Sequence, residues 1–192
     1  MSFELKPRVT YEEYLALERK AERKSEYFNG EIFAMAGASP QHVLIVTNVV
    51  SELRSQLKTR PCTVYSTDLR LKVNATGLYT YPDVIVVCGE PQFDDDHKDT
   101  LLNPTLIVEA LSESTKDYDR GGKFEQYRMI ESFVEYVLIA QNKRHVEHFV
   151  RQADNRWLLS ETNRPEDTLE LSSIACNLML TEVYDKVELW GG

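Results

Sequence analysis

A glutamate stands inside one of the most apolar runs of the chain, where a charged side chain is costly. The run is residues 106–111 (LIVEAL), and the acid is Glu109. Continuous apolar composition is typical of a strand buried on both faces of a sheet. A carboxylate there costs several kcal/mol unless it is protonated, paired or bound to a cation. Glu109 is therefore a candidate site residue, and a buried salt bridge to an arginine is the alternative.

A second acid, Asp83, opens another apolar run at residues 83–87 (DVIVV). It follows Pro82, whose fixed φ and missing N–H suit the start of a strand. Acids on adjacent strands can converge on one point, where Mg²⁺ would keep both ionised and take their oxygens as ligands. That ion can polarise a phosphoryl oxygen. Taken alone, Asp83 is better interpreted as a strand-start residue that is hydrogen-bonded to a turn.

Local signals predict the elements that precede these strands. Residues 10–13 (TYEE) fit a capping box that opens a charged helix, which we expect to extend to about Lys24. An Asn-Gly pair at 29–30 predicts a hairpin. A helix over 40–58 should pack on a sheet because its apolar residues recur at helical spacing. Those residues are Val43, Val46, Val50, Leu53 and Leu57.

The rest of the chain alternates strands with one further core helix. In chain order we expect a bent strand over 63–73 that ends in a turn at 74–77, buried strands at 83–87 and 106–111, a helix over 117–131, strands at 134–140 and 145–150, and a short terminal helix near 180–187. This order predicts an α/β (α+β) fold with a mixed central sheet flanked by helices. We expect one domain over residues 1–192.

Composition and charge restrict the class of protein. The chain is 42% hydrophobic and 28% charged, as in ordinary globular proteins. No apolar run is long enough to cross a bilayer, and the first 14 residues carry charges where a secretion signal needs an apolar core. We therefore expect a cytoplasmic protein without a membrane partner.

The formal net charge of −9 counts against a nonspecific nucleic-acid binder unless basic residues are concentrated locally. Residues 90–99 (EPQFDDDHKD) are interpreted as a solvated acidic loop, because they lack the ligand spacing of a calcium loop. Residues 19–24 and 142–145 are basic.

Three cysteines, Cys62, Cys88 and Cys176, are widely spaced along the chain. Their odd number and the absence of close Cys or His pairs suggest neither a disulfide framework nor a structural zinc site. We expect them to be small buried apolar residues.

Several segments together resemble one protein family: YPDVIVV, IVEALSEST, YDRGGKFEQYR and, upstream of them, SEYFNGEIFAMAGASPQH. They are similar to the Uma-type restriction endonuclease family of the PD-(D/E)XK nuclease superfamily, from the N-terminal helix through the hairpin after Val134. The resemblance implies a restriction-endonuclease-like core, dependence on Mg²⁺ or Mn²⁺, and hydrolysis of phosphodiester bonds in DNA. It makes Asp83 the first acid of the motif and Glu109 the second.

The chain departs from the superfamily pattern at one position. The pattern expects a lysine two residues after the second acid, where this chain has Leu111. Lys123, on the following helix, matches the lysine of this particular family. We therefore predict Asp83, Glu109 and Lys123 as catalytic residues, with the carbonyl of Ala110 as an additional metal ligand. A solvated helix lysine is the alternative for Lys123.

Other polar residues are candidate accessory residues. Glu26, His42 and Asp68 match recurrent polar positions of the family, and Tyr127 lies one helical turn from Lys123. For His42, a hydrogen bond at the start of its helix is the favoured interpretation over a metal ligand.

The sequence thus supports two hypotheses of different kinds. The first is a metal-dependent endonuclease acting on DNA, which we expect to work as a homodimer because related nucleases often cut two strands by pairing. The second is a catalytically silent nuclease-fold protein that serves as a binding or assembly module. The net charge and the displaced lysine favour the second, and the two acids favour the first.

Overall fold

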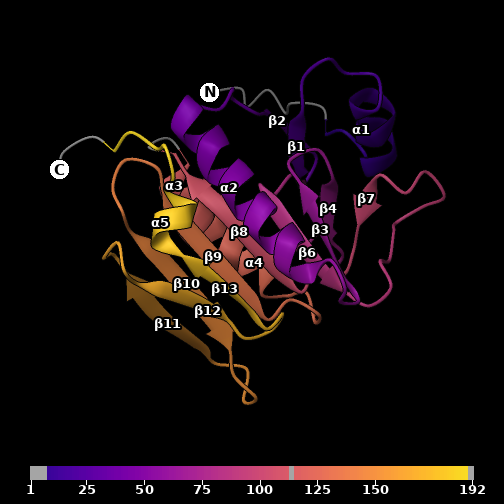
Figure 1. The fold of residues 1–192 in the computed structure, drawn as a ribbon. Coiled ribbons are helices and arrows are strands. Elements are labelled where there is room, and N and C mark those ends of the chain that lie inside the picture. Colours follow the sequence, from indigo (N-terminus) through magenta and orange to yellow (C-terminus); the bar gives the residue numbers. More distant parts are fainter. Residues whose placement is uncertain (1–7, 113–114, 190–192) are drawn as a thin grey trace.

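The computed structural model describes residues 8–112 and 115–189, so part of the N-terminal segment considered for a secretion signal lies outside the described residues. Its central element is a six-stranded sheet (Figure 1). In spatial order its strands are β11 (Trp157–Thr162), β10 (Val146–Arg151), β9 (Glu135–Ala140), β8 (Leu106–Leu111), β6 (Val84–Cys88) and β3 (Cys62–Ser66). β8 and β9 are parallel, and the other neighbouring pairs are antiparallel. The predicted mixed sheet and the predicted adjacency of β6 and β8 are confirmed.

A five-stranded sheet lies beside the six-stranded one. Its order is β2 (Glu31–Ala34), β1 (Ser25–Phe28), β5 (Leu78–Thr80), β4 (Arg70–Val73) and β7 (Thr100–Leu101). The predicted hairpin is β1–β2, with positive φ at both Asn29 and Gly30. The predicted single bent strand over 63–73 is wrong, because its halves enter different sheets. A turn separates them, in which the Asp68 N–H donates to the Ser66 carbonyl at 2.6 Å.

The helices are α1 (Tyr11–Glu18), α2 (Pro40–Leu57), α3 (Lys116–Tyr118), the π-helical turn η1 (Asp119–Lys123), α4 (Phe124–Tyr127) and α5 (Leu180–Val183). The capping box at Thr10 is present, but α1 ends six residues before the predicted Lys24. Residues beyond it are held outside the helix: Arg19 pairs with Asp99, and Lys24 pairs with Asp68. Among the described residues, no helix is both long and apolar enough to cross a membrane.

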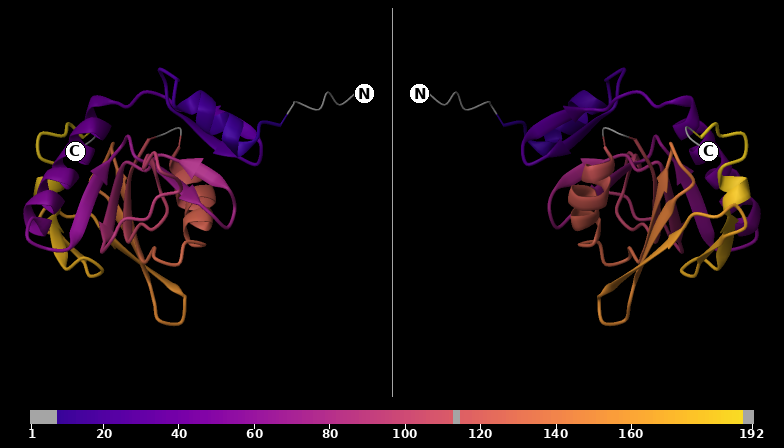
Figure 2. Two further views of the ribbon diagram at one scale, coloured as in Figure 1. Left: turned by 90° about the vertical axis from the view of Figure 1, so that its right-hand side faces the viewer. Right: turned by 90° about the vertical axis from the view of Figure 1, so that its left-hand side faces the viewer.

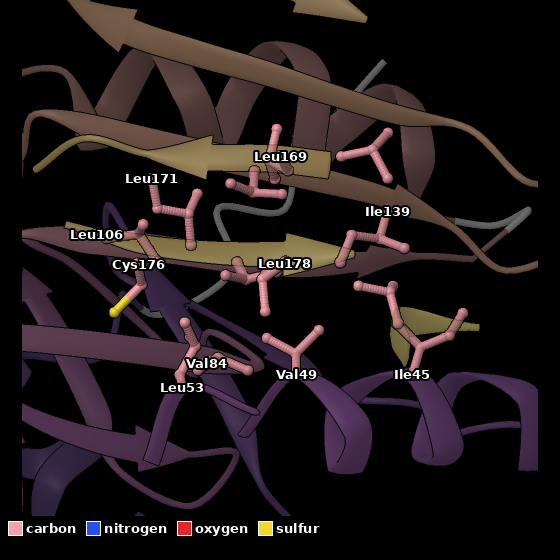
Figure 3. Packing of buried hydrophobic residues seen from close by; sticks show 14 of the residues in the cluster. Ile45, Val49, Leu53, Val84, Leu106, Ile139, Leu169, Leu171, Cys176 and Leu178 are labelled. Atoms are coloured by element: carbon pink, nitrogen blue, oxygen red, sulfur yellow. The ribbon is translucent and has the colours of Figure 1, made fainter. Parts of the chain in front are cut away.

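α2 covers one face of the six-stranded sheet, together with α5 and the hairpin of β12 (Thr168–Leu171) and β13 (Cys176–Met179) (Figure 2). Ile45, Val49 and Leu53 of α2 are fully buried among residues of the sheet and the hairpin (Figure 3). The buried face of α2 is rotated slightly from the predicted face, since Val43 is exposed and Val50 is only half-buried. The helix nevertheless packs on the sheet as predicted.

The opposite face of the six-stranded sheet carries η1 and α4, seen on the other side of the sheet in Figure 2. Its core includes Phe124 and Tyr127 from α4 and the aromatic pair Phe133 and Tyr136. Residues alternate between the two faces along β8: Leu106, Val108 and Ala110 lie in the first core, and Ile107 and Leu111 in the second. Glu109 therefore belongs to the face that carries η1 and α4.

The cysteines and the acidic loop differ from the predictions. Cys62 and Cys88 are direct cross-strand partners on β3 and β6 and form a disulfide. Linear spacing gave no sign of this contact, which depends on the register of two strands. Cys176 is free and buried, as predicted.

The loop over residues 90–99 is not simply solvated, because three of its five acids form ion pairs. Asp94 binds the Lys72 ammonium at 2.7 Å, and Asp95 and Asp99 both bind the guanidinium of Arg19. These ion pairs hold the loop against α1 and β4, so the acidic run has a structural role.

Candidate active site

Asp83 and Glu109 meet because of the register between β6 and β8. Val84 pairs with Val108, so Asp83, one residue earlier, stands opposite Glu109. The Asp83 backbone N–H donates to Glu109 Oε2 at 3.3 Å, and the Ala110 N–H donates to Asp83 Oδ2 at 2.8 Å. Backbone pairing therefore fixes both carboxylates at the end of the same pair of strands.

Glu109 is almost fully buried, with 3% of its surface exposed. Its Oε1 accepts a hydrogen bond from the Tyr127 hydroxyl at 3.0 Å and lies 3.4 Å from Lys123 Nζ. Its partner is thus a lysine, where the salt-bridge alternative had proposed an arginine. Burial raises the pKa of Glu109 well above its ordinary value; the charges of Asp83 and Asp119 add to this effect, and Lys123 opposes it.

Lys123 is only 6% exposed, so the alternative of a solvated helix lysine does not hold. Its ammonium contacts three carboxylates, at 3.2 Å to Asp119 Oδ1, 3.3 Å to Glu26 Oε1 and 3.4 Å to Glu109 Oε1. Burial by itself lowers the pKa of Lys123, but these carboxylates raise it well above its ordinary value. The lysine is therefore charged, and three carboxyl groups surround its ammonium.

The π-helical turn η1 delivers Asp119 and Lys123 to the site. Its sequence, DRGGK, contains two glycines at 121–122. A Cβ on Gly122 would lie 2.8 Å from ring atoms of Tyr118, so the ring packs directly on the glycine. Lys123 Nζ lies 5.8 Å from the centre of the same ring, close enough for a cation–π contact. π-helical turns are uncommon and are frequent at functional sites.

His42 reaches the acid pair from α2. Its backbone N–H donates to Ser39 Oγ at the start of the helix, as predicted, while its ring Nε2 lies 2.9 Å from Asp83 Oδ1. Burial lowers the pKa of His42, but the hydrogen bond and the charge of Asp83 outweigh it and raise the pKa. His42 thus holds one oxygen of Asp83 in place.

The structure brings the other predicted accessory residues into the site, with one exception. Glu26 on β1 accepts the Thr80 hydroxyl at 2.5 Å and contacts Lys123. Asp68 lies outside: its side chain is 85% exposed and pairs with Lys24. The sequence interpretation omitted Asp119 and Thr80 from the site. The spacing of four residues between Asp119 and Lys123 was a signal for the first, and no local signal marks Thr80.

A cavity of about 860 Å³ opens above these groups. Its polar lining includes Glu26, Asp83, Glu109, Asp119 and Lys123. Its apolar lining comes from β2, the following loop and α2, with Phe33, Met35, Val43, Val46 and Val50. The Asp83 side chain is 15% exposed and that of Glu109 4% exposed, so a ligand must enter the cavity to reach them.

A smaller recess of about 310 Å³ adjoins the cavity, and the two share Ser112. Its basic lining residues are Lys116, Arg120 and Lys143. Arg120 is held by Glu147 through its guanidinium, whereas Lys143 is exposed. This recess is a local concentration of positive charge of the kind that an acidic chain needs to bind phosphate.

The donor set fits a hard divalent cation. Asp83 and Glu109 supply carboxyl oxygens, which Mg²⁺ prefers as ligands, at the end of the same pair of strands. Within residues 8–112 and 115–189, no group of three or more His, Cys, Asp or Glu side chains is arranged to hold a metal ion by itself. Further ligands would have to be backbone, water or substrate oxygens, as is usual for Mg²⁺.

A mixed sheet that presents two acids on adjacent strands, with a lysine beside them from the following π-helical turn, defines a nuclease-like fold. The chain belongs to the Uma2 family, described as "Putative restriction endonuclease", whose model matches residues 11–181. The family and the α+β fold predicted from the sequence are thereby confirmed.

Relatives of this chain are similar over most of its length. It is 38% identical to the uncharacterised protein sll1609 of Synechocystis sp. over 164 residues, which cover 85% of this chain and 93% of that protein. It is 34% identical to slr1290 of the same organism, over 93% and 92% of the two chains. A crystal structure from Anabaena variabilis, described as a putative nuclease belonging to DUF820, shares the fold with a TM-score of 0.74 and 18% identity, and covers 94% of this chain and 99% of that one.

Proposed function

We propose that this protein is a metal-dependent endonuclease that hydrolyses phosphodiester bonds in DNA. The observation that carries the proposal is the pairing of Asp83 with Glu109 at the base of an open cavity, with Lys123 Nζ 3.4 Å from Glu109. Membership in the restriction endonuclease family supports the same reaction class.

In this proposal Asp83, Glu109 and the carbonyl of Ala110 hold Mg²⁺ or Mn²⁺. When bound, the ion supplies a Lewis acid that polarises a phosphoryl oxygen. The protein contributes fixed ligand positions: His42 and the Ala110 N–H each hold one oxygen of Asp83, and Tyr127 holds Glu109. Because these contacts exist before the substrate binds, little reorganisation is needed during the reaction.

Lys123 has a different role, because an ammonium cannot be a metal ligand. Its positive charge stabilises the negative charge that develops on the phosphoryl oxygens and orients the attacking water. Glu26 and Asp119 keep the lysine protonated and in place. The family's displaced lysine thus reaches the acids from η1, although position 111 is a leucine.

The test is incubation of the protein with supercoiled plasmid and with circular single-stranded DNA, each with Mg²⁺, with Mn²⁺ and with EDTA. Asp83→Asn keeps the size and a hydrogen-bond acceptor for the Ala110 N–H but removes the charge, and we expect it to abolish cleavage. Asp68→Asn is the matched control, because Asp68 is an acid that lies outside the cavity. Cleavage that survives Asp83→Asn, or that is lost equally in Asp68→Asn, would contradict the proposal.

The second candidate function is a silent binding or assembly module, and the net charge of −9 favours it. It predicts that no DNA is cut under any metal condition. A raised melting temperature with Mn²⁺ in the wild type, lost in Asp83→Asn, would then indicate a metal site without hydrolysis.

We also propose, from the sequence, a cytoplasmic homodimer. Native mass spectrometry measures the oligomeric state directly. The Cys62–Cys88 disulfide is evidence against the cytoplasmic location, because disulfides are rare in reducing compartments. Thiol labelling of protein taken directly from cells would show whether the bond forms there.

A further inference from the structure

We propose that Phe33 is a stacking platform for an unpaired nucleobase beside the bond that is cut, so that the preferred substrate is a single-stranded or locally unpaired nucleic acid. The chemistry of this inference rests on the proposed function. The inference goes beyond that function because it assigns the form of the substrate and a role to a residue outside the acid cluster.

The register of the N-terminal hairpin places Phe33 at the site. Phe33 is the direct cross-strand partner of Glu26. In an antiparallel pair such partners project from the same face with Cβ atoms about 4.5–5.5 Å apart. Glu26 Oε1 lies 3.3 Å from Lys123 Nζ. One strand pair therefore presents a lysine-binding acid and an aromatic side chain to the same cavity.

Phe33 is 46% exposed although it lines the cavity. Single exposed apolar side chains are common and need no explanation. Among the described residues, the large exposed apolar side chains that line the cavity are Phe33, Val43 and Tyr118. Val43 is not aromatic, and the Tyr118 ring already packs on Gly122 and lies 5.8 Å from Lys123 Nζ. Phe33 is therefore the candidate for a stacking contact. An open aromatic face beside phosphate-binding chemistry is the arrangement with which proteins hold unpaired bases, since every base has a π-face.

The depth of the acids favours the same substrate. Glu109 and Lys123 have side chains only 4% and 8% exposed, so the reacting phosphate must enter the cavity. A cavity of about 860 Å³ has room for a nucleotide with its base. A paired nucleotide would first have to leave its stack, which costs a few kcal/mol, whereas an unpaired one pays the least.

Binding is measured first, with the intact protein in EDTA, by fluorescence anisotropy of a labelled single-stranded oligonucleotide and of the same strand in a duplex. We expect the single strand to bind more tightly. Phe33→Ala should weaken single-strand binding roughly tenfold and leave duplex binding unchanged. Phe33→Trp should retain binding, and nucleic acid should quench its added fluorescence. Leu159→Ala is the matched control, because Leu159 is an equally exposed apolar strand residue that does not line the cavity.

Cleavage with Mn²⁺ then separates the two proposals. We expect faster cutting of single-stranded than of duplex DNA, and a raised KM with little change in kcat for Phe33→Ala. If Asp83-dependent cleavage favours the duplex, or if Phe33→Ala and Leu159→Ala behave alike, the stacking inference is wrong and the proposed function stands. If no DNA is cut but Phe33 still governs single-strand binding, the proposed hydrolysis is wrong and the binding site stands.

Discussion

Replacing Lys123 by methionine should destabilise the protein as well as inactivate it. From the sequence alone, loss of this lysine would abolish cleavage with the fold intact. The structure changes that expectation, because the ammonium is the shared partner of Glu26, Glu109 and Asp119 inside a buried cluster. Methionine keeps an unbranched chain of similar length, so the perturbation is mainly the lost charge.

The size of the effect follows from the distances. At 3.3 Å, and with an effective dielectric constant of about 20, one ion pair is worth about 5 kcal/mol of attraction. Desolvation of the ammonium offsets much of this attraction, so the net cost of breaking the cluster should be that of a broken buried pair, about 3–5 kcal/mol. Such a loss is a large part of a typical unfolding free energy of roughly 5–15 kcal/mol.

The assay is urea denaturation of the wild type, Lys123→Met, Glu109→Gln and the double variant, all in EDTA. Glu109→Gln removes one of the carboxylates that Lys123→Met leaves without its ammonium partner. The double variant should therefore be more stable than the sum of the single effects predicts. When Mn²⁺ replaces EDTA, the urea midpoint of Lys123→Met should rise more than that of the wild type, since the ion replaces a missing positive charge. Lys20→Met, at an exposed lysine, is the matched control.

A loss below about 1 kcal/mol for Lys123→Met, similar to that of Lys20→Met, would refute the account of the cluster. So would strictly additive effects of Lys123→Met and Glu109→Gln, because residues in direct contact must couple if the contact matters.

The other predictions concern η1, the acidic loop and the basic recess. Gly122→Ala should lower the free energy of unfolding by about 1–3 kcal/mol and reduce cleavage, because the added Cβ would meet the Tyr118 ring. Gly121→Ala should be close to neutral, because a Cβ there meets nothing within 4 Å; thermal denaturation of both variants measures the difference. The hydrogen bond from Arg19 lowers the pKa of Asp99. Asp99 therefore contributes stability above its unfolded pKa of about 4, and this contribution is lost as pH falls toward its folded pKa. Denaturation midpoints measured against pH should fall less steeply at acid pH for Asp99→Asn than for the wild type. Lys143→Ala should weaken single-strand binding and lower the slope of log affinity against log salt by roughly 0.7, as for one lost phosphate contact; an unchanged slope would place the phosphates elsewhere.

Continuous apolar runs with an internal acid were the most informative part of the sequence. β6 and β8 could be predicted because central strands are apolar on both faces, and the acid within β8 and the acid just before β6 stand out from that background. That the two strands are neighbours was predicted, whereas the register that places Asp83 opposite Glu109 comes from the structure. Lys123 was found only through resemblance to the family.

The features that the sequence did not predict depend on contacts between distant segments. Alternation along 69–73 indicates a strand but not the sheet that it joins, so β3 and β4 were taken as one element. The disulfide required knowing that Cys62 and Cys88 are cross-strand partners. The spacing of four residues indicates that Asp119 and Lys123 can be neighbours on a helix, but not that both are buried beside the acid pair.

The π-helical turn makes the site sensitive to chain length as well as to residue type. One residue advances an α-helix by about 100° of rotation, so deleting a residue from the turn would rotate Lys123 relative to the segment before it. Phe124 and Tyr127 are fixed in the aromatic core, so the rotation would fall on Asp119 and on α3, which precede Gly121. A variant that lacks Gly121 would keep every side chain of the site, but these side chains would no longer lie close together. In this segment an insertion or deletion therefore changes the geometry of the site more than most substitutions would.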